Sequence, residues 1–439
     1  MTFREFLEER LHIGSVPVPV SAECRHFFIM GRSGTGKTRL IYSFLEKIRR
    51  QRKKAIIYDF KGDYVSFFFD PEKDLIFNPL DVRTLHWSLF TEIETHADID
   101  TIAASLIPPS RSEDKFWVDG ARDVFSAILF YLKMMKLESN PAVWEHTTLS
   151  EAEMLEVMQN AAAQGVEAAK RASGYLQGFE KGSKVASDVL STMRQYTNCF
   201  YYCRHLQNQF CIKDWISSEG EGFLFVVGYP RLRDTLKPLL SLFVDLLIKS
   251  VLSLDDDPHR RIYFIIDEFA TLQKLSSILQ GLEQGRSKGL SLVIALQDFN
   301  QLERIYHESA YSILNNCSTI CVFAVNDPRT QEVLSKTLGD TEKLETDESL
   351  SMGPEDLRDG LSLQRRRKIE RLVLPAELGG IKDLHCYIKM LHYPVALVKI
   401  QFVSYSKKNE SLILNPIFVF PSNSSSDSSN QICTGIASD

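Results

Sequence analysis

Short hydrophobic runs alternate with helical periodicity along much of this chain. Residues 26–30 and 55–59 have the composition of strands, and between them the apolar positions of residues 40–48 recur at the spacing of an amphipathic helix. Such runs, separated by helices, indicate a mainly parallel, twisted sheet that is buried on both faces, and therefore an α/β fold. Further strands are expected at residues 223–227, 262–266, 292–295 and 320–324.

The middle of the chain follows a different pattern. Between residues 84 and 207 the β-branched runs disappear and helical patterns replace them. This change predicts an all-α domain at residues 84–207, inserted into a discontinuous nucleotide-binding domain made of residues 1–83 and 208–420. Residues 421–439 are rich in Ser and Asn and have little to bury, so we expect a disordered tail.

Composition and charge change this picture only slightly. Of the 439 residues, 44% are hydrophobic and 25% are charged, as in ordinary globular proteins. The net charge of −6 counts against a large basic surface but leaves room for a local basic channel. The eight cysteines lack zinc-ligand spacing and are expected to be reduced thiols of a cytosolic protein. No apolar run reaches the roughly 18 residues of a membrane span.

A glycine-rich loop lies between the first predicted strand and the first predicted helix. Its glycines allow backbone N–H groups to surround phosphates without Cβ clashes, and the helix start adds a favourable field. Lys37 is expected to reach the β and γ oxygens of ATP, and the Thr38 hydroxyl to ligate Mg²⁺. A chance glycine turn is the alternative, but the flanking strand and helix favour a nucleotide site. The loop, which fits G-x-x-x-x-G-K-[ST], comprises Gly31, Arg32, Ser33, Gly34, Thr35, Gly36, Lys37 and Thr38.

Two acids follow the strand expected at residues 262–266. A buried strand that ends in carboxylates is typical of the Walker B motif. We expect Asp267 to hold the Mg²⁺ shell and Glu268 to orient the attacking water. The alternative is an acidic helix start, since Asp and Glu are favoured there.

Two more residues are candidates for catalysis, each with a structural alternative. Gln297 follows the strand at residues 292–295 and would sense the γ-phosphate if that strand neighbours the phosphate-loop strand; otherwise it is a polar strand end. Arg286 lies in a stretch that also has the composition of a helix C-terminus. Its sharper interpretation is an arginine supplied to the γ-phosphate of a neighbouring subunit.

With these motifs, the chain resembles the coupling proteins of conjugative type IV secretion systems, of the TraD and TrwB type. Segments that carry the resemblance run in the family order over nearly the whole chain, beyond the motifs already described. They are residues 13–19, 59–64, 77–81, 87–90, 116–117, 266–270, 285–290, 296–302 and 371–378.

The resemblance implies a RecA-like P-loop NTPase that binds ATP and Mg²⁺ and translocates DNA. It implies a hexameric ring with ATP between subunits, a helical domain over the cytosolic end, and sequence-independent DNA binding in the pore. Arg286 would act in trans and Gln297 as sensor, with relaxosome and secretion-channel components as partners. Family members usually begin with a transmembrane anchor, so we expect the cytoplasmic face of the inner membrane. A double-strand DNA pump of the FtsK/HerA kind and a nucleotide-switched receptor for secreted proteins remain alternatives.

Overall fold

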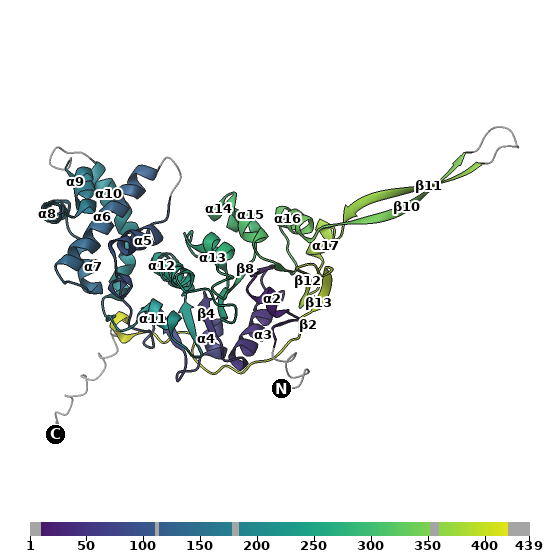
Figure 1. The fold of residues 1–439 in the computed structure, drawn as a ribbon, viewed down its shortest axis with the longest axis horizontal. Coiled ribbons are helices and arrows are strands. Elements are labelled where there is room, and N and C mark those ends of the chain that lie inside the picture. Colours follow the sequence, from purple (N-terminus) through teal and green to yellow (C-terminus); the bar gives the residue numbers. More distant parts are fainter. Residues whose placement is uncertain (1–9, 110–113, 178–183, 352–359, 420–439) are drawn as a thin grey trace, which may run out of the picture.

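A nine-stranded, mainly parallel sheet forms the centre of the computed structural model, which describes residues 10–109, 114–177, 184–351 and 360–419 (Figure 1). The strand order is β13-β12-β9-β3-β8-β7-β4-β6-β5, and only β12 and β13 run antiparallel to their neighbours. The predicted α/β class is therefore confirmed. The strands are β3 (Phe27–Met30), β4 (Lys54–Asp59), β5 (Leu75–Phe77), β6 (Gly222–Val227), β7 (Ile262–Ile266), β8 (Leu290–Leu296), β9 (Thr319–Val322), β12 (His385–Met390) and β13 (Ala396–Lys399).

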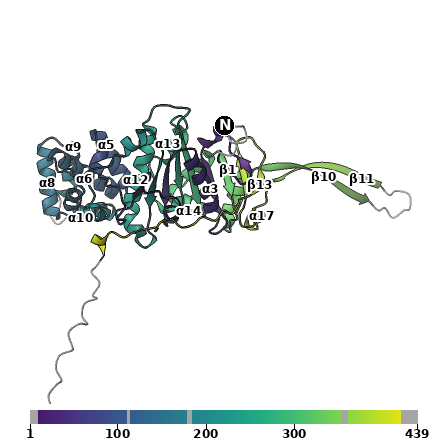
Figure 2. The ribbon, with the colours of Figure 1, turned by 90° about the horizontal axis from the view of Figure 1, so that it is seen from below.

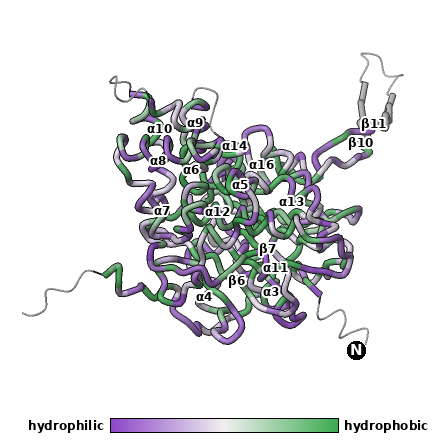
Figure 3. Tube along the Cα trace, turned by 60° about the vertical axis from the view of Figure 1, so that its left-hand side comes forward, coloured by the Kyte–Doolittle hydropathy of each residue, from purple (hydrophilic) through white to green (hydrophobic). Residues whose placement is uncertain are grey.

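Both faces of this sheet are buried, which explains why its strands are continuous hydrophobic runs. In β3, Phe28 and Met30 point into one hydrophobic cluster while Phe27 and Ile29 point into another. The same alternation follows the period of two residues along each strand. Figure 3 shows the apolar character of β6 and β7 in the middle of the molecule.

Helices cover the two faces unequally. The helices α3 (Lys37–Arg50) and α4 (Asp63–Phe68) contribute to the smaller cluster. The larger cluster extends through α12 (Arg233–Leu252) into the helical part of the chain, so the two parts share one core. The remaining helices on this face are α13 (Ile278–Gln284), α14 (Phe299–Tyr306), α15 (Ser309–Asn315), α16 (Pro328–Leu338) and α17 (Pro375–Gly379).

The chain between β5 and β6 is helical and lies at one end of the molecule (Figures 1 and 2). It leaves and returns at a paired neck, where the His86 carbonyl accepts hydrogen bonds from the Gln209 and Phe210 N–H groups at 3.2 and 2.9 Å. The exact boundaries at residues 84 and 207 stay a prediction, and the predicted tail lies outside the described residues. The helices are α5 (His96–Leu106), α6 (Lys115–Met134), α7 (Asn140–Thr147), α8 (Glu151–Ala163), α9 (Glu167–Leu176), α10 (Val185–Thr197) and α11 (Ile212–Ser217).

At the opposite end, the hairpin of β10 (Asp340–Ser351) and β11 (Gly360–Arg371) projects away from the body (Figure 2). A small ribbon of β1 (His12–Ile13) and β2 (Val16–Pro17) lies near the sheet edge. Across the described residues, no helix combines the length and apolar composition needed to cross a membrane. The cysteines of this part of the chain are all free: Cys24, Cys199, Cys203, Cys211, Cys317, Cys321 and Cys386.

Candidate functional site

Three parallel strands, β3, β8 and β7, lie side by side and bring the predicted motifs to one edge of the sheet. The phosphate loop follows β3, Gln297 follows β8, and Asp267 and Glu268 follow β7. The strand before Gln297 thus neighbours the phosphate-loop strand, as its interpretation as a sensor requires. Because parallel strands end at the same edge, residues far apart in sequence meet in one crevice.

The loop has the backbone that a phosphate cradle needs. Gly34 and Gly36 have φ of +84° and +119°, values that favour glycine. Gly36 is also the residue from which α3 starts, so the positive end of that helix faces the loop. At Gly31 a Cβ would lie 2.5 Å from Cβ of Phe323, which excludes any larger residue.

Lys37 lies buried beneath this loop. Its Nζ donates hydrogen bonds to the carbonyl oxygens of Gly31 and, at 3.2 Å, Arg32. Burial lowers the pKa of Lys37, while the nearby carboxylates of Glu268 and Asp267 oppose that shift. The Lys37 ammonium group therefore lies beneath the phosphate loop, where it donates to neutral carbonyl oxygens. A bound phosphate would be a stronger, charged acceptor.

The two acids after β7 have different surroundings. Asp267 accepts a hydrogen bond of 2.8 Å from the Tyr64 hydroxyl. Burial raises the pKa of Asp267, and the charge of Glu268 adds to this, while Tyr64 and Lys37 lower it. A cation bound at Asp267 would stabilise the ionised form in the same way that Lys37 does.

Glu268 has a left-handed backbone, with φ of 54° and ψ of 51°. This conformation costs a non-glycine residue on the order of 1–3 kcal/mol and persists where the surroundings impose it, often at functional sites. It directs the carboxylate toward Gln297, whose Nε2 donates a hydrogen bond to Oε1 of Glu268.

Asp59 organises the loop after β4, a role that sequence reasoning did not assign. Its buried carboxylate accepts four backbone N–H hydrogen bonds of 2.8–3.0 Å from residues 62–65. Burial raises its pKa to about 7 against the effect of these hydrogen bonds. The fold of this loop brings Lys61 and Asp63 to the crevice and Tyr64 to Asp267. The sequence held a signal for this role of Asp59: it ends a predicted strand and precedes Gly62 by three residues.

These elements surround a cavity of about 420 Å³. Its donor set fits a magnesium nucleotide: backbone N–H groups and Lys37 for phosphates, and the oxygens of Thr38 and Asp267 for a hard cation. Leu384 and Phe402 add apolar surface at its outer part, where the Arg39 guanidinium lies 4.4 Å from the Phe402 ring centre. Other lining residues are Ser33, Gly34, Gly36, Asp59, Phe60, Lys61, Asp63, Glu268 and Asp383.

Gln297 does not line this cavity but reaches its edge through the hydrogen bond to Glu268. Arg286 lies away from the cavity altogether. It occupies the exposed turn between α13 and β8, at the amino end of β8, whereas the crevice lies at the carboxyl ends. Within one chain it therefore does not join the other site residues. A catalytic contribution requires a second copy.

Comparisons with known proteins agree with this geometry. Coupling protein TraD of Escherichia coli (strain K12) is 28% identical over 408 residues, which cover 90% of this chain and 55% of TraD. The chain thus spans about half the length of that relative. The unbound structure of the bacterial conjugative coupling protein TrwBdeltaN70 superposes with a TM-score of 0.81 at 27% identity, covering 92% of this chain and 91% of that one.

A second solved structure, plasmid coupling protein TrwB in complex with ADP and Mg²⁺, has a TM-score of 0.80 at 26% identity, covering 93% and 92% of the two chains. The family model of the type IV secretion-system coupling protein DNA-binding domain matches residues 10–401. That match takes in the sheet, the crevice and the helical part together. The chain therefore belongs to the family of type IV secretion-system coupling protein DNA-binding domains.

Proposed function

We propose that this protein is an ATP-driven DNA-translocating coupling ATPase of a conjugative type IV secretion system. The observation that carries the proposal is the meeting of the phosphate loop, Asp267 and Glu268 in one cavity. A phosphate cradle alone binds nucleotide, whereas a carboxylate beside it that can orient water makes a hydrolase. The solved relative that holds ADP and Mg²⁺ supports the same assignment.

Each residue has a distinct task in this mechanism. The loop N–H groups and Lys37 bind the β- and γ-phosphates, while Thr38 and Asp267 would hold Mg²⁺, which neutralises phosphate charge. Glu268 orients and polarises the attacking water. Gln297 contacts Glu268 and reports the γ-phosphate, because a new acceptor there competes for its amide.

Partners and assembly belong to this proposal as well. We propose sequence-independent binding of DNA phosphates, a ring of about six copies, and Arg286 of one copy acting on the nucleotide of the next. The relaxosome and channel components would be the protein partners, and the working place would be the cytoplasmic face of the inner membrane. The family name, with its DNA-binding domain, supports the nucleic-acid part.

ATP hydrolysis with and without DNA tests the proposal. The protein should hydrolyse ATP in the presence of Mg²⁺, and added DNA should raise the rate. Lys37→Ala is the control, since loss of its charge at the phosphates should abolish turnover. Turnover of Lys37→Ala within a few-fold of wild type would contradict the site, and slow turnover that ignores DNA would favour the nucleotide-switched receptor.

A further inference from the structure

A second cavity lies on the other side of Glu268 and has a volume of about 500 Å³. It shares Phe60, Lys61 and Glu268 with the nucleotide cavity, so the two cavities are neighbours. The other residues that line it come from the start of α12, the turn after β7, the end of β8, and α14: Arg233, Lys237, Ala270, Thr271, Gln297, Gln301, Arg304 and Ile305.

This cavity is strongly cationic. Four of its lining residues are basic, namely Lys61, Arg233, Lys237 and Arg304, and none of them forms an ion pair with any described residue. Lys237 is half-buried and the other three are exposed. The one carboxylate among the described lining residues is Glu268, which already accepts from Gln297. Arg233 contacts only an aromatic face, with its guanidinium carbon 5.8 Å from the Phe60 ring centre.

The cations are placed where the fold disfavours them. Arg233 begins α12 and Lys237 follows one turn later, at the positive end of a 20-residue helix. Cations are destabilising there, since the helix dipole favours negative charge at that end. Burial, and then the charge of Arg233, lower the pKa of Lys237, while Asp234 opposes them. Because Glu268, the one carboxylate among the described residues of the lining, already accepts from Gln297, a bound anion would balance the four cations.

The donors suit a phosphate group. Guanidinium and ammonium groups and the amides of Gln297 and Gln301 line one space. Proteins position nucleic-acid backbones with this mixture of donors. We infer that this cavity binds a backbone phosphate of nucleic acid and that its occupancy acts on Glu268 through Gln297. The inference rests on the proposed function and assigns the contact that links DNA to hydrolysis.

Gln297 makes this link because it lines the second cavity and contacts Glu268, which lines both cavities. Its amide donates a hydrogen bond to the Glu268 carboxylate. A phosphate is a second anionic acceptor for the same amide and competes with the Glu268 carboxylate. The Glu268 carboxylate is then free to accept a hydrogen bond from the attacking water, which is the arrangement that general-base catalysis needs.

The test compares wild-type protein with the double variant Arg233→Gln/Lys237→Gln. Binding of a fluorescent single-stranded oligonucleotide is measured at several salt concentrations, together with ATP turnover with and without DNA. The slope of log affinity against log salt should fall by about 1 or more. DNA stimulation should be lost while turnover without DNA stays within about twofold of wild type. The control, Lys336→Gln/Lys408→Gln, removes the same charge at exposed lysines elsewhere and should behave as wild type.

Each result decides a different point. Wild-type protein that shows no DNA binding or stimulation would overturn the proposed function and this inference with it. Wild type that responds to DNA, with a double variant of equal salt slope and stimulation, would overturn this inference alone. A double variant that binds DNA normally but loses self-association would mean that a carboxylate of a second copy occupies the cavity, and the phosphate assignment would be wrong.

Discussion

At the scale of single residues, the site depends on two residues, Glu268 and Asp267, that the fold holds in energetically unfavourable states. Glu268 keeps a left-handed backbone, and Asp267 stays in a buried place that disfavours its charge. Tyr64 and Lys37 partly offset this by favouring the ionised carboxylate. Such strain persists because the surrounding strands and loops determine the conformation.

We expect Glu268→Gln to keep ATP binding and to lose about 100-fold or more in turnover. The amide retains the shape but cannot accept a proton from the water, while the Mg²⁺ ligand Asp267 remains. Nucleotide affinity and single-turnover hydrolysis measure the two effects. Asp267→Asn is the matched comparison and should weaken Mg²⁺-dependent binding instead. A collapse of affinity in Glu268→Gln would show that the roles of the two acids are reversed.

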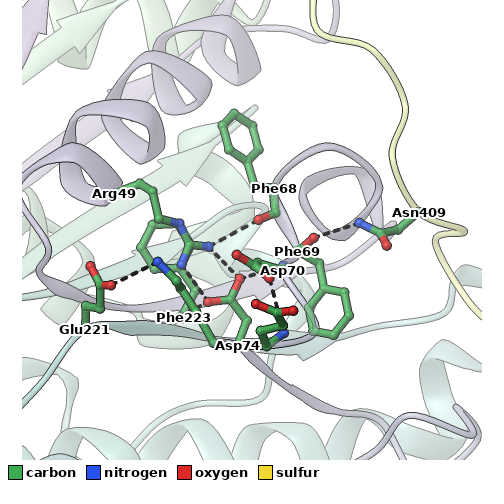
Figure 4. A network of polar contacts seen from close by, with 10 residues as sticks. Arg49, Phe68, Phe69, Asp70, Asp74, Glu221, Phe223 and Asn409 are labelled. Atoms are coloured by element: carbon green, nitrogen blue, oxygen red, sulfur yellow. Dashed lines mark hydrogen bonds and ion pairs between the residues drawn. The ribbon is translucent and has the colours of Figure 1, made fainter.

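At the scale of elements, single buried polar groups join neighbouring strands and helices. Arg49, at the end of α3, pairs with the fully buried Asp74, which also accepts from the N–H groups of Asp70 and Phe223 (Figure 4). The Arg49 guanidinium carbon lies 3.7 Å from the Phe223 ring centre. Arg49 therefore serves packing, and its charge suits its place in the last turn of α3.

Asp74→Ala should lower the free energy of unfolding by about 3–5 kcal/mol, since it leaves a partly buried guanidinium and two backbone N–H groups without their acceptor. Arg50→Ala is the control: Arg50 pairs with Glu46 at the surface, and its loss should cost about 0–1 kcal/mol. Urea denaturation of both variants checks this. Equal losses would mean that the Asp74 network does not hold α3 to β6.

His26 gives the β3–β8 pairing a pH dependence. The Nδ1 atom of this buried residue accepts the Leu292 N–H at 3.1 Å, so the ring must be neutral. Burial lowers its pKa from 6.5 to about 4. Because the folded value lies below the unfolded one, this contribution is complete above pH 6.5 and is lost as the pH falls toward 4.

The His26 contribution amounts to about 3 kcal/mol between these limits. In His26→Asn, which keeps an acceptor and suits the left-handed φ of 62°, stability should fall less over this pH range. Unfolding curves at several pH values measure the difference. Parallel curves for the two proteins would show that His26 titrates normally.

At the scale of the whole molecule, the distance of Arg286 from the nucleotide crevice fits our proposal that the enzyme needs more than one copy of the chain. The crevice opens at the carboxyl edge of the sheet, and Arg286 lies at the amino end of β8. A guanidinium that reaches the γ-phosphate from another copy stabilises transition-state charge and is worth on the order of a thousandfold in rate.

Arg286→Ala should therefore bind ATP normally and turn it over about a thousandfold more slowly. Mixing Arg286→Ala with Lys37→Ala provides the decisive measurement. Arg286→Ala keeps an intact phosphate loop and its acids, and Lys37→Ala keeps an intact Arg286. Hydrolysis should recover in the mixture. If Arg286→Ala alone matches wild type, then Arg286 is only a helix-end charge.

The sequence by itself determined the α/β class, most sheet strands and the residues of the phosphate loop. These depend on local patterns: apolar runs, helical periodicity and fixed glycine spacing. Asp267, Glu268 and Gln297 were predictable as strand-end residues for the same reason. The boundaries of the helical domain stay predictions, because its core merges with that of the sheet.

Tertiary structure alone decided which strand ends meet and what lies between them. The order β3-β8-β7 places Gln297 in contact with Glu268, although the two residues follow different strands, β8 and β7. The long β10–β11 hairpin escaped prediction because its strands have polar sequences without an alternation of apolar and polar residues. The cationic cavity is lined by residues that follow β4, β7 and β8 and by residues of α12 and α14. No local pattern records such a convergence, because sheet pairing depends on contacts between distant parts of the chain.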